Sequence, residues 1–180
     1  MPRKNHKSGY DVTQILTSEG GILRVGSARA TLLTESAFVF MQRVIHEQMP
    51  EFTNYGFYEM GYRAGLDLSR TVRRAGDAEK AFRAFIETYR QSGYGNIEVV
   101  AFDFDKPEVL LRGRNLIEAA AARDSGIFRT PRAVDHYSRG MFAGLFSQLL
   151  GKEVICEELS CQYRGDPACE FSVMAFGGGV

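Results

Sequence analysis

The sequence predicts an α+β fold in which helices pack on an antiparallel sheet. Apolar residues recur at helical spacing through the first half of the chain, and the period changes to that of strands near residue 97. The last two predicted strands are joined by a connection of hairpin length, which implies antiparallel pairing. The chain has 180 residues, 44% of them apolar, and shows no repeat or linker, so we expect one domain over 1–180.

The N-terminal part of the chain, about 10–93, is predicted to be mainly helical. It opens irregularly, with a short hairpin at the turn signal Gly20-Gly21. Thr34 is a suitable N-cap for the first helix, and Pro50 ends that helix. The three predicted helices cover about 34–49, 54–75 and 77–92.

Two glycines in the second of these helices indicate a close contact. Gly61 and Gly65 lie four residues apart and therefore on one face. Glycine costs about 1 kcal/mol inside a helix, so a pair on one face suggests that another backbone packs against it. Room for a ligand at this face is the alternative.

The C-terminal part, about 97–176, is predicted to hold the sheet and one long helix. Thr130-Pro131 combines an N-cap with proline at the first helical position, and the helix is expected to run to Leu150. The turn Arg164-Gly165-Asp166-Pro167 joins the last two strands. The four predicted strands are 97–104, 108–118, 153–162 and 168–175.

Composition excludes several classes of protein. Twenty-two basic residues balance 22 acidic ones, so no net charge attracts nucleic acid. No apolar run reaches the roughly 18 residues of a membrane span, and the start lacks the apolar core of a signal peptide. The three cysteines fall within 156–169 and do not form a disulfide framework, so we expect a cytoplasmic protein.

The cysteines instead indicate a metal site in the closing hairpin. The predicted turn brings Cys161 and Cys169 to facing ends of adjacent strands, and Glu158 lies beside them. Two thiolates and a carboxylate supply three ligands of a tetrahedral zinc site, and the fourth must come from elsewhere, since Cys156 sits early in its strand. Two alternatives are open: ordinary buried cysteines, and a disulfide between Cys161 and Cys169.

The same region resembles the 4-vinyl reductase domain family. Asn115-Leu116-Ile117-Glu118-Ala119 is similar to the strand that precedes the long helix in that family. The other matching positions, spaced over the helix and the hairpin, are Asp135-His136-Tyr137-Ser138-Arg139-Gly140, Gly144, Leu149-Leu150-Gly151-Lys152-Glu153-Val154, Glu158, Cys161, Gly165-Asp166-Pro167, Cys169 and Phe171.

This resemblance implies the twisted antiparallel sheet covered by helices that the family shares with core subunits of the TRAPP tethering complex, commonly as dimers. Relatives include the sensory domains of phenol- and xylene-responsive activators, where a buried pocket takes an aromatic effector beside a zinc ion. Carried over by position, Glu158, Cys161 and Cys169 match three zinc ligands. The fourth family ligand is a cysteine, and this chain has Asp135 there, with His136 as the alternative.

No pattern in the sequence supports catalysis. The glycine pairs lack the spacing and the helix of a nucleotide-binding loop, and no Ser-His-Asp set or His-Glu-x-x-His helix is present. A zinc ion with four protein ligands has no open position for substrate. We therefore expect a protein that is not an enzyme, with a structural zinc site.

The expected function is a sensor or carrier of a small hydrophobic or aromatic ligand, which would signal through a protein partner. The alternatives are an accessory or carrier protein of chlorophyll-type tetrapyrrole biosynthesis and a scaffold without ligand. A homodimer is expected through the helix of residues 35–49, whose Phe38, Phe40, Met41, Val44 and Ile45 wrap widely around it. The candidate pocket residues are Phe82, Phe85, Tyr89, Phe102, Phe104, Tyr137, Met141 and Phe142.

Overall fold

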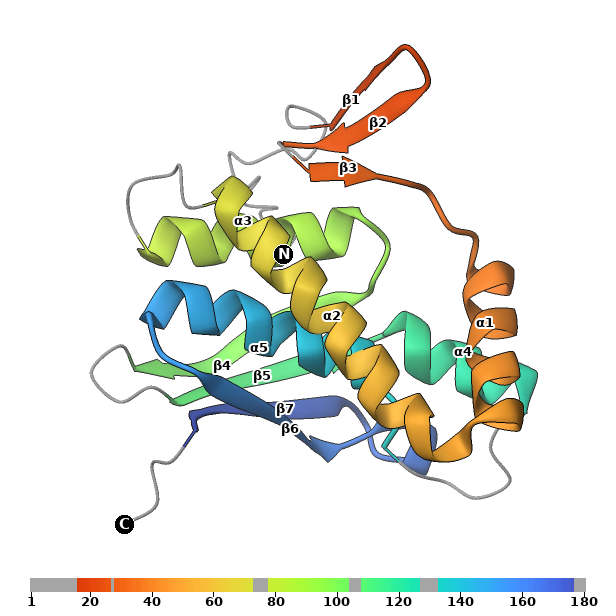
Figure 1. Ribbon diagram of the computed structural model, residues 1–180. Coiled ribbons are helices and arrows are strands. Elements are labelled where there is room, and N and C mark those ends of the chain that lie inside the picture. The colour runs from red at the N-terminus through yellow and green to blue at the C-terminus, as the bar shows by residue number, and fades with distance from the viewer. Residues whose placement is uncertain (1–15, 27, 73–77, 104–107, 127–132, 177–180) are drawn as a thin grey trace, which may run out of the picture.

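The computed structural model describes residues 16–26, 28–72, 78–103, 108–126 and 133–176. Within them the α+β fold predicted from the sequence is confirmed (Figure 1). The elements are β1 (Leu16–Glu19), β2 (Ile22–Val25), β3 (Ala28–Ala30), α1 (Glu35–Gln48), α2 (Pro50–Val72), α3 (Ala78–Gln91), β4 (Asn96–Asp103), β5 (Glu108–Arg114), α4 (Ile117–Ser125), α5 (His136–Leu150), β6 (Val154–Ser160), the short 3-10 helix η3 (Gln162–Arg164) and β7 (Cys169–Ala175).

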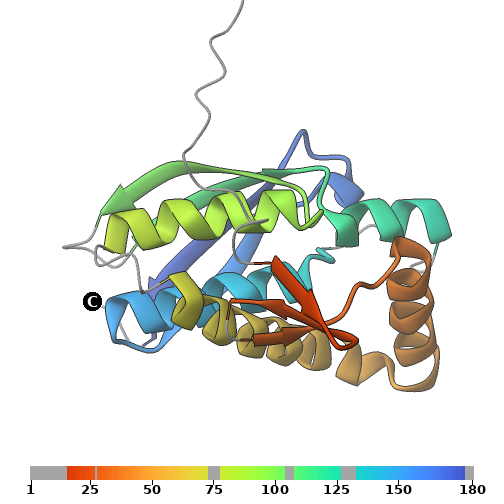
Figure 2. The same cartoon turned by 90° about the horizontal axis from the view of Figure 1, so that it is seen from above.

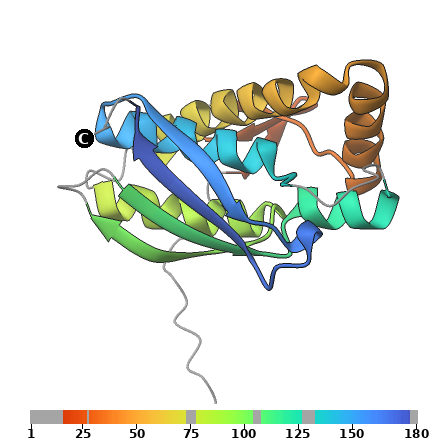
Figure 3. The same cartoon turned by 90° about the horizontal axis from the view of Figure 1, so that it is seen from below.

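The main sheet has the strand order β4-β5-β7-β6, and every neighbouring pair is antiparallel. Helices α3 and α5 lie on one face of it, and α2 crosses α5 on the side away from the sheet (Figures 1 and 2). Seen from below, no helix of the described residues crosses the other face (Figure 3). The core therefore lies between the sheet and the α3–α5 layer.

Aromatic side chains fill most of this core. Phe142 of α5 contacts Phe171 of β7 edge to face, with ring centroids 5.2 Å apart, and also contacts Phe85 of α3. All three are wholly buried. Burying a large apolar side chain contributes about 1.5–3 kcal/mol, so these contacts join helix layer and sheet into one core.

Helices α2 and α5 touch through their backbones. A Cβ atom built on Gly61 would lie 1.9 Å from the Tyr137 carbonyl oxygen, and one on Gly140 would lie 1.9 Å from the Tyr58 carbonyl oxygen. The partner glycines one turn on, Gly65 and Gly144, are almost as tightly placed. The close backbone packing predicted from Gly61 and Gly65 is confirmed, and the glycine face on α5 is its counterpart.

The N-terminal elements agree with the sequence in outline. Thr34 caps α1 as predicted, because its hydroxyl accepts a hydrogen bond from the Ala37 N–H. The predicted short hairpin is part of a three-stranded antiparallel sheet, β1-β2-β3, and α2 already begins at Pro50 rather than near residue 54. Proline fits there because the first helical position needs no N–H donor.

Two predictions about the C-terminal part were wrong. The second strand does not reach residue 118: it ends at Arg114, Asn115 adopts a left-handed conformation with φ 55°, and α4 follows. The alanine run within α4 has high helix propensity, which outweighs a strand there. The long helix starts at His136, and residues 133–135 are not helical; Thr130-Pro131 lies outside the described residues.

Candidate metal centre

Four side chains that could hold a metal ion meet where α5 begins. They are Asp135, Glu158, Cys161 and Cys169, and one ligand atom of each lies within 4.8 Å of the others. Asp135 occupies the N-cap position of α5, Glu158 belongs to β6, and the cysteines flank the turn between β6 and β7. The set is the one predicted from the sequence. All of it is buried except Glu158, which is half-buried.

The turn between the two cysteines is fixed by hydrogen bonds. The Cys161 N–H donates to the Asp166 carboxylate at 2.8 Å, and the Asp166 N–H donates to the Cys161 carbonyl at 3.3 Å. The Gln162 N–H donates to the Cys169 sulfur at 3.2 Å. A donor aimed at a sulfur favours its thiolate form, so this N–H would help to stabilise a Cys169 thiolate beside a cation.

The carboxylates are held just as specifically. The Ala119 N–H donates to Asp135 Oδ1 at 3.2 Å, while Asp135 Oδ2 lies 3.9 Å from the Cys161 sulfur. The Asp135 N–H donates to Glu158 Oε2 at 3.1 Å. Glu158 Oε1 is buried and has no hydrogen-bond partner among the described residues. A buried oxygen without a partner costs free energy, and a cation would remove that cost.

Electrostatics in this corner of the protein oppose negative charge. Burial, followed by repulsion from Glu158 and Glu118, raises the pKa of Asp135 well above its ordinary value. The pKa of the Cys169 thiol is also raised, first by the hydrogen bond between Cys169 and Cys161 and then by the burial of Cys169. Several acids therefore compete to stay protonated within a few ångströms of each other. A divalent cation would reverse this preference, because it favours the charged form of every ligand.

Neither Cys156 nor His136 belongs to the group that comes together. Cys156 is buried, and its carbonyl accepts a hydrogen bond from Arg139 at 3.0 Å. The His136 ring is buried, with Nδ1 3.3 Å from an Arg139 guanidinium nitrogen. All three cysteines are free thiols, which argues against the alternative of a Cys161–Cys169 disulfide.

Glu118 is a buried acid at this site that sequence reasoning missed. It lies in the first turn of α4 and is wholly buried, and its two carboxylate oxygens accept hydrogen bonds from the Tyr137 and Ser138 N–H groups at 2.7 and 2.8 Å. Burial raises its pKa to about 8. The available signal was a glutamate beside a run of alanines. Only a correct prediction of helix α4 would have placed this glutamate on the buried face.

The predicted pocket residues pack against one another between α3, α5 and the sheet. The Tyr89 and Ser138 hydroxyls form a hydrogen bond of 2.8 Å, and the Tyr94 and Tyr137 hydroxyls form one of 3.2 Å. Tyr94 was not among the predicted residues, and it stacks on Tyr137 with centroids 5.5 Å apart. Phe104 lies outside the described residues. The other predicted members lie in or against the core cluster: Phe82, Phe85, Tyr89, Phe102, Tyr137, Met141 and Phe142.

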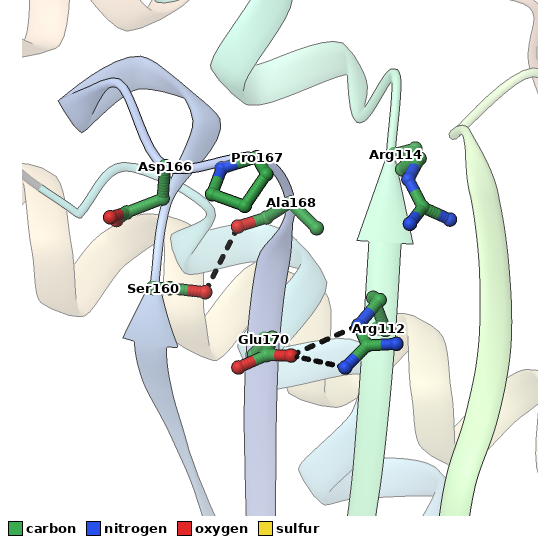
Figure 4. Close-up of a pocket in the computed structure, with 7 residues that line it drawn as sticks. All are labelled: Arg112, Arg114, Ser160, Asp166, Pro167, Ala168 and Glu170. Atoms are coloured by element: carbon green, nitrogen blue, oxygen red, sulfur yellow. Dashed lines mark hydrogen bonds and ion pairs between the residues drawn. The ribbon is translucent and has the colours of Figure 1, made fainter.

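A hollow lies on the helix-free face of the sheet (Figure 4). Arg112 and Glu170 form an ion pair of 2.8 Å across neighbouring strands there, and Ser160 donates a hydrogen bond to the Ala168 carbonyl. Because these groups already satisfy one another, the hollow is a weaker candidate for a ligand site than the metal centre. Its lining residues are Arg112, Arg114, Ser160, Asp166, Pro167, Ala168 and Glu170.

The surface of α1 and of the start of α2 is unusually apolar. Phe40 is 66% exposed, and Leu32, just before α1, is 85% exposed. Phe38, which the sequence placed in the same interface, is buried against Phe57 and Tyr137. We call the exposed set the α1–α2 patch; it comprises Leu32, Leu33, Phe40, Val44, Met49, Phe52, Tyr55 and Met60.

Comparison with known families confirms the resemblance predicted from the sequence. Residues 125–175 match the model of the 4-vinyl reductase domain. An uncharacterized protein of Methanocaldococcus jannaschii is 28% identical over 141 residues, which are 78% of this chain. The match spans 66% of that relative's length.

Solved structures show the same fold. The phenol-responsive sensory domain of the transcription activator PoxR, solved with phenol, superposes with a TM-score of 0.83 at 19% identity, covering 91% of this chain and 86% of that one. A vinyl-4-reductase family protein from Methanocaldococcus jannaschii superposes with a TM-score of 0.54 at 16% identity. The match covers 82% of this chain and 84% of that one. A trafficking protein particle complex subunit 3 from Naegleria fowleri, covalently bound to palmitic acid, superposes with a TM-score of 0.51 at 17% identity. The match covers 79% of this chain and 95% of that one.

None of the helices in the described part of the chain combines the length and apolar character that a membrane crossing requires.

Proposed function

We propose that this chain is a non-catalytic binding module for small hydrophobic or aromatic molecules, a sensor or carrier, stabilised by one structural zinc ion. The observation that carries the proposal is the group of Asp135, Glu158, Cys161 and Cys169, of which all but the half-buried Glu158 are buried. We also infer that residues 1–180 form one domain, since one hydrophobic cluster extends from α3 to β7.

Zinc suits the donors that meet at this site. Two thiols and two carboxylates can supply four ligands, and thiolates select zinc over magnesium or calcium. The unpartnered Glu158 Oε1 fits a ligand role. Four protein ligands leave no coordination position for a substrate, so the metal would be structural and would fasten the β6–β7 turn to the start of α5.

The aromatic cluster between α3, α5 and the sheet is the proposed ligand site. It begins at Tyr137 and Ser138, directly after the metal centre, and offers tyrosine hydroxyls among apolar rings. This combination suits a planar molecule with one polar group. The rings are in contact with each other, so we expect a ligand to bind by moving the Tyr94–Tyr137 pair apart.

The experiment is titration calorimetry of the zinc-loaded protein with phenol, the ligand of the structurally similar sensory domain. We expect saturable binding with a negative heat-capacity change. Tyr137→Phe, which removes one hydroxyl of the Tyr94–Tyr137 pair, should weaken binding. Phe52→Leu, an exchange on the exposed surface, is the matched control.

Native mass spectrometry of freshly purified protein separates this function from its alternatives. A retained aromatic molecule supports the sensor or carrier, and a retained pigment supports a role in tetrapyrrole biosynthesis. A clean dimer mass, together with no heat on adding phenol, would contradict the binding function and favour a scaffold.

We further propose that the chain forms a homodimer through the α1–α2 patch. Several large apolar side chains exposed on neighbouring elements are typical of protein–protein interfaces. None of its residues belongs to the aromatic cluster, so each protomer would keep its own ligand site.

A further inference from the structure

Asp135 does not do what an aspartate at its position ordinarily does. An aspartate at an N-cap usually accepts hydrogen bonds from the second or third N–H of its own helix. Asp135 stands at the N-cap of α5 but makes no such bond. Its Oδ1 accepts from Ala119 of α4, and its Oδ2 lies 3.9 Å from the Cys161 sulfur.

Glu118 takes over the vacant capping role. Its carboxylate accepts from the N–H groups of Tyr137 and Ser138, the second and third residues of α5. Helices α4 and α5 therefore cap each other. Glu118, from the first turn of α4, satisfies the start of α5, while Asp135 satisfies the N–H of Ala119 in the first turn of α4.

We propose that Glu118 is a positioning residue for the metal centre: by capping α5 in place of Asp135, it leaves the Asp135 carboxylate turned toward the two thiols as the fourth ligand. This inference rests on the zinc centre proposed above. It also explains how an aspartate can be the fourth ligand at the position where the related family has a cysteine. A cysteine has no comparable tendency to cap a helix.

The physical reason is competition for one carboxylate. Without Glu118, two N–H groups at the start of α5, that of Ser138 buried and that of Tyr137 partly buried, lose their acceptor, and unsatisfied buried donors are costly. The Asp135 side chain stands at the position from which aspartate caps a helix, so a rotation about its Cα–Cβ bond would satisfy them. That rotation would withdraw Oδ2 from the metal. A cysteine at position 135 would not compete in this way, because sulfur is a weak acceptor.

A double-mutant cycle tests this mechanism. Zinc affinity is measured by competition with a chromophoric chelator for wild type, Glu118→Ala, Asp135→Cys and the double variant, all as full-length chains. We expect Glu118→Ala to weaken zinc binding by roughly 10–100-fold in the wild-type background, as loss of an orienting partner does at other metal sites. In the Asp135→Cys background the same change should have a much smaller effect.

Cobalt(II) in place of zinc gives a spectroscopic readout that loss of stability alone would not move. The visible bands of Glu118→Ala should change as a carboxylate ligand is replaced, while those of Asp135→Cys and the double variant should coincide. Glu118→Gln keeps one acceptor oxygen and should be intermediate. If Glu118→Ala does not fold, the Gln variant carries the same comparison.

Two results would overturn the inference. Equal losses in both backgrounds would mean that Glu118 acts through general stability or charge, and unchanged affinity in Glu118→Ala would mean that it does not position Asp135. Failure of the underlying zinc proposal looks different, because the wild-type protein itself would then bind neither zinc nor cobalt tightly.

Discussion

Two neighbouring regions of the molecule, which meet at α4, hide and expose opposite kinds of side chain. Helices α4 and α5 and the β6–β7 turn meet at one corner of the molecule (Figure 3). Acids and thiols are buried at this corner, and most of their polar atoms have specific partners. On α1 and the start of α2, large apolar side chains face outward, as Phe40 and Leu32 show. One region withdraws polar groups from water, and the other leaves apolar groups in it.

Each of the two regions lacks a partner of a different kind. Buried carboxyls and thiols, with Glu158 Oε1 unsatisfied, need a cation to become favourable. An exposed apolar surface needs a second apolar surface, which in this proposal is another copy of the chain. The first region should therefore govern the stability of the protomer, and the second should govern assembly.

The largest effect is expected from loss of a thiolate. Cys161→Ser or Cys169→Ser should abolish zinc binding, and with it much of the roughly 10–16 kcal/mol by which structural zinc stabilises small zinc proteins. Elemental analysis and urea unfolding measure both quantities. Cys156→Ala, which alters a buried thiol outside the metal group, should keep one zinc per chain. Zinc-free wild-type protein with unchanged stability would contradict this prediction.

The second-largest effect is expected at the backbone contact between α2 and α5. Gly61→Ala places a methyl group where the Tyr137 carbonyl oxygen lies 1.9 Å away, so α2 and α5 must separate, at a cost of about 1–3 kcal/mol or more. Gly56→Ala, on the same helix, meets only the Phe52 ring, which is partly exposed and can turn aside. That control should be neutral or slightly stabilising. Equal unfolding midpoints for the two variants would refute the backbone contact.

Sequence reasoning succeeded where the determining contacts are local. Thr34 caps α1 through a residue three positions on, and the turn at 164–167 sets Cys161 and Cys169 side by side. Period and turn residues report such contacts directly. The proximity of the four candidate ligands was predictable, because the hairpin supplies three of them and the family resemblance supplies the position of Asp135; the bound metal stays a prediction.

Sequence reasoning failed where contacts between distant segments of the chain determine the structure. The start of α4, up to residue 118, was predicted as a continuation of β5, because the apolar pattern of the strand runs into Leu116 and nothing in the pattern shows the left-handed turn at Asn115. The capping role of Glu118 depends on N–H groups 19 and 20 residues further along the chain. Short-range spacing carries no information about such a pair.

A smaller effect is expected at the fourth ligand position. Asp135→Cys should tighten zinc binding, because a third thiolate suits this metal better than a carboxylate does. The gain will be reduced by loss of the hydrogen bond from Ala119, so the net change should be less than the change caused by removing Cys161 or Cys169. Competition with a chelator measures it. Unchanged affinity would mean that position 135 supplies no ligand; loss of the metal in His136→Ala would then identify His136 as the fourth ligand, and retention would mean that the fourth position is empty.

The smallest effect on the protomer, and the largest on assembly, is expected from the α1–α2 patch. Phe40 is 66% exposed, so Phe40→Glu should change the free energy of unfolding of the monomer by no more than about 0.5 kcal/mol, as surface substitutions usually do. In a dimer that buries this ring, the new carboxylate would lose its hydration without a partner, so the variant should be monomeric. Light scattering measures the change.

Gln48→Glu, an exposed position on the same helix, adds the same charge outside the patch and should leave the dimer intact. Phenol binding by the Phe40→Glu monomer should equal that of wild type, because the aromatic cluster lies within one protomer. A monomeric wild-type protein would refute the interface. A monomeric variant that no longer binds phenol would instead make the two regions one functional unit, with the ligand site completed by the second copy.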